Sequence, residues 1–416
     1  MIATLIKIAV LLGGIMTAAA YFVLLERRMA AWVQDRHGPN RVGAPLSLLG
    51  LKDLRLFGLG QPAADGLKMI FKEEYMPAHV DKVLYVLAPL VIMAAALAVF
   101  AVVPFGSFLP AVPALGIDAQ PNLIIAPDLD VGMLYVFALS SIAVYGVILG
   151  GWASNNKYSF LGGLRSSAQL IAYELPLGLG ILGVVLATGS LKLDAIMHAQ
   201  ASGGWFALLQ PLGFLVFVIA AFAEAARLPF DLPECEQELI GGYHTEYAGM
   251  KLLLFLIAEF VHMITASFLI VILFFGGWHL PFGLTGPVGE NVSDVGWGMG
   301  LLRVAVLMGK ITLVIMFFML VRWSWPRFRF DQLMTLAWKV MLPLGMVNLV
   351  AVALIHEAGH GTFGTGVAAF ANSWISAIIT WAVFILSWVV VIYTSPFVAD
   401  NRPRRDLLEH GIDPQI

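Results

Sequence analysis

Cysteine and charged residues are both scarce in this sequence. It contains a single cysteine, Cys235, among 416 residues, and only 12% of its residues are charged. One cysteine excludes an internal disulfide and any iron–sulfur cluster ligated by the chain's own cysteines. The shortage of charge, with 60% hydrophobic residues, excludes an ordinary soluble domain. The net charge of −3 says nothing about nucleic acid, and no nucleic-acid partner is expected. If the protein takes part in redox chemistry, its electrons must come from another subunit.

Long hydrophobic runs dominate what is present. About nine of them reach the ~20 apolar residues that a helix needs to cross ~30 Å of hydrocarbon. They cover residues 2–25, 83–104, 131–152, 168–189, 205–226, 252–275, 300–321, 333–355 and 373–393. The first is followed by Glu26-Arg27-Arg28 and not by a cleavage site, so it reads as a retained span. The sequence therefore predicts an all-α, polytopic transmembrane helical bundle.

The basic residues predict the orientation of this bundle. Most of the 24 lysines and arginines fall in segments on one side of the predicted spans. The positive-inside rule places that side in the cytoplasm. The N-terminus is then expected outside and the C-terminus in the cytoplasm, which agrees with an odd number of spans.

The segment from Glu224 to Glu259 concentrates acids between two hydrophobic runs. Its carboxylates are Glu224, Asp231, Glu234, Glu236, Glu238, Glu246 and Glu259, against two fixed bases, Arg227 and Lys251. Carboxylates beside or within hydrocarbon are costly and usually serve a proton, ion or substrate pathway. The alternative is an acidic loop solvated in the cytoplasm. That alternative does not explain why Glu224 ends one run and Glu259 lies inside the next.

The longest segment on the basic side, residues 26–82, contains a second distinctive pattern. A helix is predicted to start at Gln61-Pro62, with proline at a position that the first turn tolerates. Apolar residues fall mostly on one face and charged residues on the other: Ala63, Leu67, Ile70, Phe71 and Tyr75 against Asp65, Lys68, Lys72 and Glu73. This pattern predicts an amphipathic helix in the membrane interface, which can also cover the cytoplasmic end of the bundle.

A short motif near residue 356 suggests a different function. His356-Glu357-Ala358-Gly359-His360 matches the H-E-x-x-H pattern of zinc proteases. We interpret the match as accidental, because no third ligand is evident and the required helix is expected to be broken by Gly359, Gly361, Gly364 and Gly366. No metal site is therefore predicted, although an intramembrane protease stays an alternative.

Several longer motifs resemble one family, the H subunit of NADH–quinone oxidoreductase, respiratory complex I. They are Glu26-Arg27-Arg28, residues 35–43, residues 61–68, Phe71-Lys72-Glu73, Tyr173-Glu174-Leu175-Pro176, residues 224–249 and residues 326–332. The resemblance covers about residues 1–355, an eight-span core with loops that form a quinone chamber. Residues 356–416 are predicted to add an external glycine-rich loop, a further span and a basic cytoplasmic tail.

The resemblance implies a membrane component of a proton-pumping bacterial enzyme in the inner (plasma) membrane. Quinone is the expected substrate, and flavin and iron–sulfur clusters are expected on partner subunits, with no cofactor bound by this chain alone. The chamber entrance is expected between the first span, the amphipathic helix, and the sixth and seventh spans. The family's quinone-cavity positions correspond to Arg27, Arg36, Asp65, Gly66, Lys68, Phe71, Lys72, Glu73, Arg227 and Asp231.

The resemblance also implies a path for protons toward antiporter-like membrane subunits. Its expected members are Glu174, Glu224, Asp231, Glu234, Glu236, Glu238, Glu246 and Glu259. Neighbouring carboxylates can share protons near neutral pH, so a change of charge in the cavity can alter protonation along the path. Two further alternatives remain, the membrane anchor of a membrane-bound hydrogenase and a free-standing cation–proton antiporter.

Overall fold

The computed structural model describes residues 2–43, 57–106, 124–125, 129–231, 241–280, 297–362 and 374–394. Within them all regular structure is helical. The helices are α1 (Ile2–Val33), α2 (Gln61–Phe71), α3 (Lys82–Ala98), η2 (Val99–Ala101), α4 (Gly132–Ala153), α5 (Lys157–Thr188), α6 (Leu193–Gly203), α7 (Phe206–Leu209), α8 (Pro211–Glu224), η4 (Gly242–His244), α10 (Gly249–Phe274), α11 (Trp297–Ser324), α12 (Phe330–Thr335), η7 (Leu336–Met341), α13 (Leu342–Thr362) and α15 (Trp374–Thr394). Eight helical segments in these residues are long and apolar enough to cross a membrane. The predicted polytopic helical bundle is confirmed.

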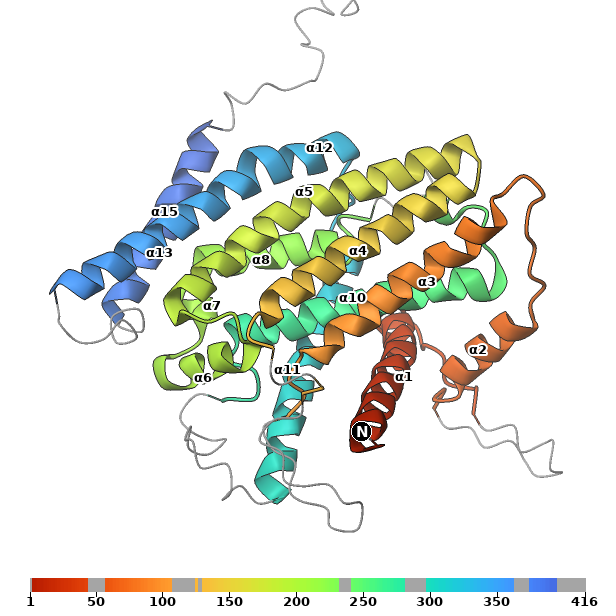
Figure 1. Ribbon diagram of the computed structural model, residues 1–416, viewed down its shortest axis with the longest axis horizontal. Helices are drawn as coiled ribbons and strands as arrows, with labels where there is room; N and C mark the ends of the chain where they lie inside the picture. Colours follow the sequence, from red (N-terminus) through yellow and green to blue (C-terminus); the bar gives the residue numbers. More distant parts are fainter. Residues whose placement is uncertain are drawn as a thin grey trace, which may run out of the picture.

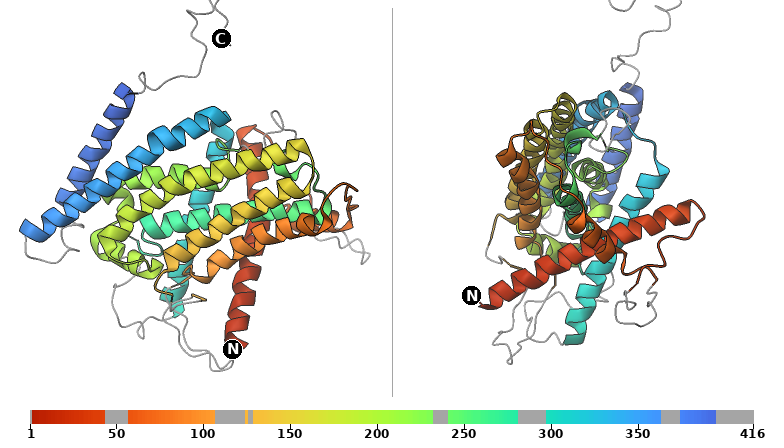
Figure 2. Two further views of the ribbon diagram at one scale, coloured as in Figure 1. Left: turned by 45° about the horizontal axis from the view of Figure 1, so that its top comes forward. Right: turned by 90° about the vertical axis from the view of Figure 1, so that its right-hand side faces the viewer.

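The spans fall into two groups with different directions. Figure 1 shows α3, α4, α5 and α10 running side by side, with α8 and α13 along the same layer. Helices α1 and α11 cross this layer steeply, as the two turned views confirm (Figure 2). The short α2 lies beside α1, away from the centre of the bundle (Figure 1). The crossing brings Glu26 of α1 and Arg322 of α11 to the cavity that α10 lines with Glu259, where the charged residues of the site gather.

The predicted span over residues 205–226 is not one continuous helix. It is divided into the four-residue α7 and the fourteen-residue α8. Pro211 begins α8, and proline has no N–H to continue a preceding helix. Helix α15 compensates for the break, since Thr380 Oγ1 donates to the carbonyl of Leu209 (2.6 Å) and Trp381 Nε1 to that of Leu208 (2.9 Å). In a membrane such carbonyls would otherwise lack partners.

The predicted amphipathic helix over the segment from Gln61 is present, but it ends before the last apolar residue of its pattern, Tyr75. Helix α2 begins at Gln61 and ends at Phe71, and none of its residues is buried in the chain. Lys72 leaves the helix with extended backbone, so Tyr75 does not continue the apolar face. The extended segment brings Glu74 to the start of α10, where its Oε2 is 2.8 Å from Nζ of Lys251. This contact gives a physical reason for the early end of the helix.

Helices α4 and α5 approach closely through small residues. A Cβ added to Gly151 would lie 2.8 Å from the carbonyl oxygen of Ser159 and 3.2 Å from Cα of Gly163. Small residues allow such contact between membrane helices. The approach holds Ser140 of α4 and Glu174 of α5 in walls of the same small cavity.

The structure corrects the expected loop after residue 355. Helix α13 continues through Thr362, so the predicted boundary falls inside a helix and Gly359 and Gly361 do not end it. Each glycine costs a helix only ~1 kcal/mol relative to alanine. Helix α13 packs against α5, α8 and α15, and this packing outweighs the weak propensity. The remaining predicted loop and the basic tail lie outside the described residues.

Candidate functional site

The larger of two adjoining cavities lies between α1, α2, α10 and α11. Its volume is about 990 Å³. Apolar side chains of α1 and α10 form much of the wall, including Val23, Leu253 and Phe260. Charged residues also line it: Glu26, Arg27, Arg36, Asp65, Lys68, Arg227, Glu259 and Arg322. The cavity therefore combines a hydrocarbon-like wall with a dense set of charges.

Glu26 is the centre of a buried ion-pair network at the inner end of this cavity. Its Oε2 lies 3.1 Å from NH1 of Arg227, and its Oε1 accepts a hydrogen bond from Arg322. Nε of Arg227 is in turn 2.8 Å from Oε1 of Glu259. The Arg227 guanidinium also lies over the ring of Phe260, 4.2 Å from its centroid. One arginine, 3% exposed, thus joins two carboxylates whose helices are far apart in sequence.

The α2 side of the cavity is held by a second ion pair. NH1 of Arg27 is 2.7 Å from Oδ2 of Asp65, and Gln61 Nε2 donates to Oδ1 of the same carboxylate at 3.0 Å. Gly66 follows Asp65 and also lines the cavity. A Cβ placed on Gly66 would meet no atom within 4 Å, so its side of the cavity is open space.

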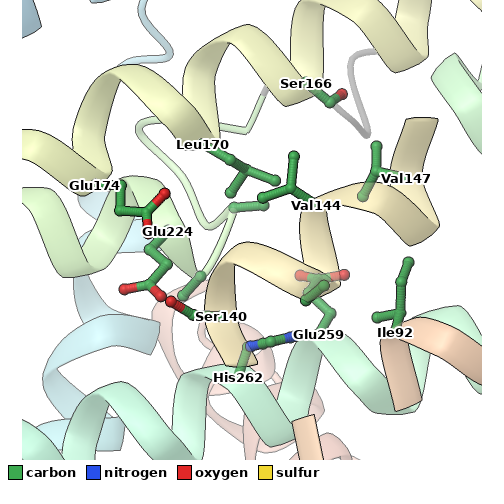
Figure 3. A pocket seen from close by; sticks show the side chains of 13 residues that line it. Ile92, Ser140, Val144, Val147, Ser166, Leu170, Glu174, Glu224, Glu259 and His262 are labelled. Carbon is green, nitrogen blue, oxygen red and sulfur yellow. The ribbon is translucent and has the colours of Figure 1, made fainter. Parts of the chain in front are cut away.

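The smaller cavity, of about 70 Å³, is enclosed by α3, α4, α5, α8 and α10. Its polar lining consists of Ser140, Ser166, Glu174, Glu224, Glu259 and His262. Figure 3 shows the Ser140 hydroxyl against the carboxylate of Glu224, with Glu174 close above them. Ser141 donates a hydrogen bond to Oε1 of Glu174. In contrast to the larger cavity, no arginine or lysine is among these lining residues.

Glu259 belongs to both cavities. It lies in the first half of α10 and lines the larger cavity together with Arg227 and the smaller cavity together with Glu224 and His262. The buried ion-pair network and the cluster of acids therefore meet at one side chain. Chemically, this arrangement can transmit a change of charge, or a proton, from one cavity to the other.

The structure brings most of the predicted cavity residues together. Arg27, Arg36, Asp65, Gly66, Lys68 and Arg227 line the larger cavity. Phe71, Lys72 and Glu73 are exposed and do not line it. Asp231 is buried outside its wall, with Oδ2 3.0 Å from NH2 of Arg327.

The structure brings only some of the predicted proton-path residues together. Glu174, Glu224 and Glu259 share the smaller cavity. Glu246 lies elsewhere, where its Oε1 accepts from Asn156 Nδ2 at 2.6 Å and its carbonyl from the Tyr85 hydroxyl at 2.6 Å. Glu234, Glu236 and Glu238 lie outside the described residues. The structure thus joins three of the predicted carboxylates in one cavity.

Three residues of the site were not selected from the sequence: Glu26, Arg322 and His262. A signal for Glu26 was present, because it ends the first hydrophobic run as Glu224 ends the fifth. His262 follows Glu259 by three residues inside a hydrophobic run, which places both on one helical face. Arg322 had no comparable signal, since a base at the end of a predicted span is common. Among the described residues, no group of three or more His, Cys, Asp or Glu could hold a metal ion.

Comparison with known proteins gives a consistent result over most of the chain. The sequence profile of a family described as NADH dehydrogenase matches residues 6–353. The chain is 43% identical over 332 residues to the first H subunit of NADH-quinone oxidoreductase from Cytophaga hutchinsonii, covering 80% of this chain and 90% of that protein. It is 47% identical over 347 residues to the H subunit of NADH-quinone oxidoreductase from Leptospira biflexa, covering 82% and 91%. For NADH-quinone oxidoreductase subunit 8 of Rhodothermus marinus the identity is 44% over 348 residues, covering 83% and 94%.

Proposed function

The chain belongs to the family of H subunits of NADH-quinone oxidoreductase, which are membrane subunits of respiratory complex I, and we propose that its two cavities couple quinone chemistry to proton translocation. The larger cavity forms much of the quinone chamber. The smaller cavity begins a path of carboxylates toward the other membrane subunits. The observation that carries this proposal is the position of Glu259 in both cavities.

The larger cavity has the properties that a quinone requires. An isoprenoid tail needs an apolar passage, and a headgroup needs a few polar groups that fix its orientation. Apolar residues of α1 and α10 supply the first, while Arg27, Asp65 and Arg36 supply polar groups on the α2 side. The volume of about 990 Å³ is near the upper end of small-molecule sites, which are roughly 300–1,000 Å³. Gly66 keeps one wall free of side-chain atoms, which suits a bulky chain.

Arg227 gives a physical route from the chamber to Glu259. Reduction of a quinone to a quinol takes up two electrons and two protons, and the electrons come from partner subunits that carry the flavin and iron–sulfur clusters. Protons withdrawn from the chamber leave negative charge there. Arg227, held between Glu26 and Glu259, then stabilises Glu259 less well as a carboxylate. Opposite charges within ~4–6 Å favour ionisation of an acid, so weakening this pair favours uptake of a proton by Glu259.

The protons continue through the smaller cavity in this proposal. Glu224 and Glu174 have serine hydroxyls as neighbours and no fixed base in the cavity wall, so either can bind a proton without breaking an ion pair. The proposed path also includes Asp231, Glu246, Glu234, Glu236 and Glu238. The receiving partners are antiporter-like membrane subunits. The N-terminus faces the outside of the bacterial plasma membrane and the C-terminus the cytoplasm.

Removal of single charges in the assembled enzyme tests the proposal. Glu224→Gln and Glu259→Gln are expected to lower NADH:quinone turnover and proton pumping by about tenfold or more, as loss of a proton-transferring group typically does. Ferricyanide reduction should remain, because it requires only the electron-transfer part of the enzyme. Glu357→Gln, at a glutamate of α13 that lines neither cavity, serves as the matched control. Wild-type pumping in both test variants, with assembly checked on native gels, would refute the assignment.

The partners of the chain can be examined independently. Purification of the tagged chain in mild detergent should recover peripheral-arm and antiporter-like subunits of NADH-quinone oxidoreductase. Recovery of a nickel-ligating hydrogenase subunit in their place would support a hydrogenase anchor, and proton exchange by the purified chain alone would support an antiporter.

A further inference from the structure

His262 occupies a central position in the smaller cavity. It lies three residues after Glu259 on α10, and residues at this spacing project from the same helical face. In the view of Figure 3, its imidazole lies between the carboxylate of Glu259 and the pair formed by Glu224 and Ser140. All four residues line the cavity. The side chain is therefore placed on the way from the larger cavity to the deeper acids.

Few other residues that line the smaller cavity could carry a proton between Glu259 and Glu224. Besides the serines, glutamates and His262, the wall is apolar: Ile92, Ala143, Val144, Val147, Leu170, Ala225 and Ala226. Neutral imidazole has one nitrogen that accepts a proton and one that donates it. The cavity of about 70 Å³ also has room for water, since one molecule needs on the order of 10–15 Å³.

We propose that His262 carries protons between Glu259 and Glu224. The proposal rests on the function proposed above for the two cavities and adds a residue to it. Protonated Glu259 gives its proton to one ring nitrogen, directly or through a water molecule, and becomes a carboxylate while the ring becomes imidazolium. The other ring nitrogen then releases a proton to the Glu224 carboxylate, which becomes a carboxylic acid. One proton has moved, and rotation of the neutral ring restores its original tautomer.

The charges that face His262 suit this role. Burial disfavours a charged ring, so His262 is neutral at rest. Glu259 on its own helix, Glu224 on α8 and Glu174 on α5 line the same cavity, and their carboxylates offset part of this cost when the ring takes up a proton. Arg227 lies on the far side of Glu259, 2.8 Å from its Oε1. Loss of a proton from Glu259 therefore strengthens an existing ion pair at the same time as it charges the ring.

A second buried histidine, His279, has basic neighbours where His262 has acidic ones. His279 follows α10, and its carbonyl accepts a hydrogen bond from Nζ of Lys310 at 2.7 Å. Burial, His198, Arg303 and Lys310 together lower the pKa of His279 to about 4. Burial is the largest of these causes, and the ring is neutral at physiological pH. His279 is consequently a matched control, because it is a buried histidine that lies beyond the C-terminal end of α10 and lines neither cavity.

The test compares His262→Gln with His279→Gln in the assembled complex reconstituted into liposomes. Glutamine keeps a polar side chain but cannot carry a proton. We expect His262→Gln to lower pumping and quinone turnover about tenfold while ferricyanide reduction stays at the wild-type rate, as expected for a lost proton-transfer group. His279→Gln should pump normally. Added imidazole should restore pumping to His262→Ala and leave His262→Gln unchanged, which a purely structural defect would not show.

Wild-type pumping by His262→Gln would overturn the proposal. If Glu224→Gln is defective at the same time, the carboxylate path stands and only the role of His262 is lost. If Glu224→Gln also pumps normally, the proposed function itself fails. Should the His262 variants not assemble, infrared difference spectra of the wild-type complex with ring-labelled histidine decide the question, since a transient imidazolium must appear on quinone reduction.

Discussion

The two cavities differ in the partners of their carboxylates. In the larger cavity each acid that lines the wall has an arginine: Glu26 has Arg227 and Arg322, Glu259 has Arg227, and Asp65 has Arg27. In the smaller cavity, Glu174 and Glu224 lie against serine hydroxyls and no fixed base shares the wall. Only Glu259 takes part in both environments.

This difference indicates different roles for the acids. Those paired with an arginine keep their charge, whereas those beside hydroxyl groups can take up and release a proton. An arginine beside a carboxylate keeps it ionised, because protonation would leave the arginine without its counter-charge. An acid that faces hydroxyls can be neutral or charged at a smaller difference in free energy. We therefore expect variants in the larger cavity to affect stability and substrate binding, and variants in the smaller cavity to affect proton transfer with little loss of stability.

The largest expected effect is the loss of Arg227. Arg227→Met should reduce the amount of assembled complex severely, because breaking a buried ion pair by removal of one partner costs roughly 3–5 kcal/mol. The double variant Arg227→Met with Glu259→Gln should recover part of the assembly, since Glu26 retains Arg322. Native gels and thermal unfolding of the detergent-solubilised complex give the measurement. Full assembly of Arg227→Met alone would show that the network does not stabilise the fold.

Glu174→Gln should lower proton pumping without lowering stability, whereas Arg227→Met is expected to lower stability. The amide can still accept the hydrogen bond from Ser141, so assembly and thermal stability should match the wild type. Pumping should fall by roughly tenfold, because an amide cannot transfer a proton. The experiment measures both quantities on one preparation. A large loss of stability with normal pumping per assembled enzyme would place Glu174 in the structural group.

Substitution of Gly66 should give a smaller effect that depends on the substrate. Gly66→Leu places a side chain in the open space of the larger cavity, so turnover with long-tailed quinone should fall several-fold more than turnover with a short-tailed analogue. Gly66→Ala should be mild, because it adds one methyl group and improves helix propensity by ~1 kcal/mol. Steady-state kinetics with the two quinones provide the measurement. Equal losses with both would indicate a folding defect, and wild-type rates for Gly66→Leu would place the tail elsewhere.

The smallest effect is expected at the H-E-x-x-H motif. His356→Ala and Glu357→Ala should leave turnover and pumping unchanged, because neither residue lines either of the two cavities. Metal analysis of the purified complex accompanies the assays. Loss of activity together with stoichiometric zinc would revive the protease interpretation.

The sequence predicted which residues belong to the site better than it predicted which of them contact one another. Hydrophobic runs predicted the helical bundle, and Glu259 within one of them indicated function without knowledge of neighbours. The contact between Glu26 and Arg227 joins residues 201 positions apart, and no periodicity within one helix reports such a distance along the chain. The division of α7 from α8 was also missed, because the apolar run continues across Gln210 and α15 satisfies the broken backbone from outside that run.

The central claim is that a change in the larger cavity alters protonation in the smaller one. Infrared difference spectra of the assembled complex, recorded on reduction of bound quinone, test it most directly. A band from protonated carboxyl groups should change in the wild type and be lost in Glu224→Gln. The same band should be reduced in Glu259→Gln, in which the link between the cavities is broken. An unchanged band in both variants would contradict the account.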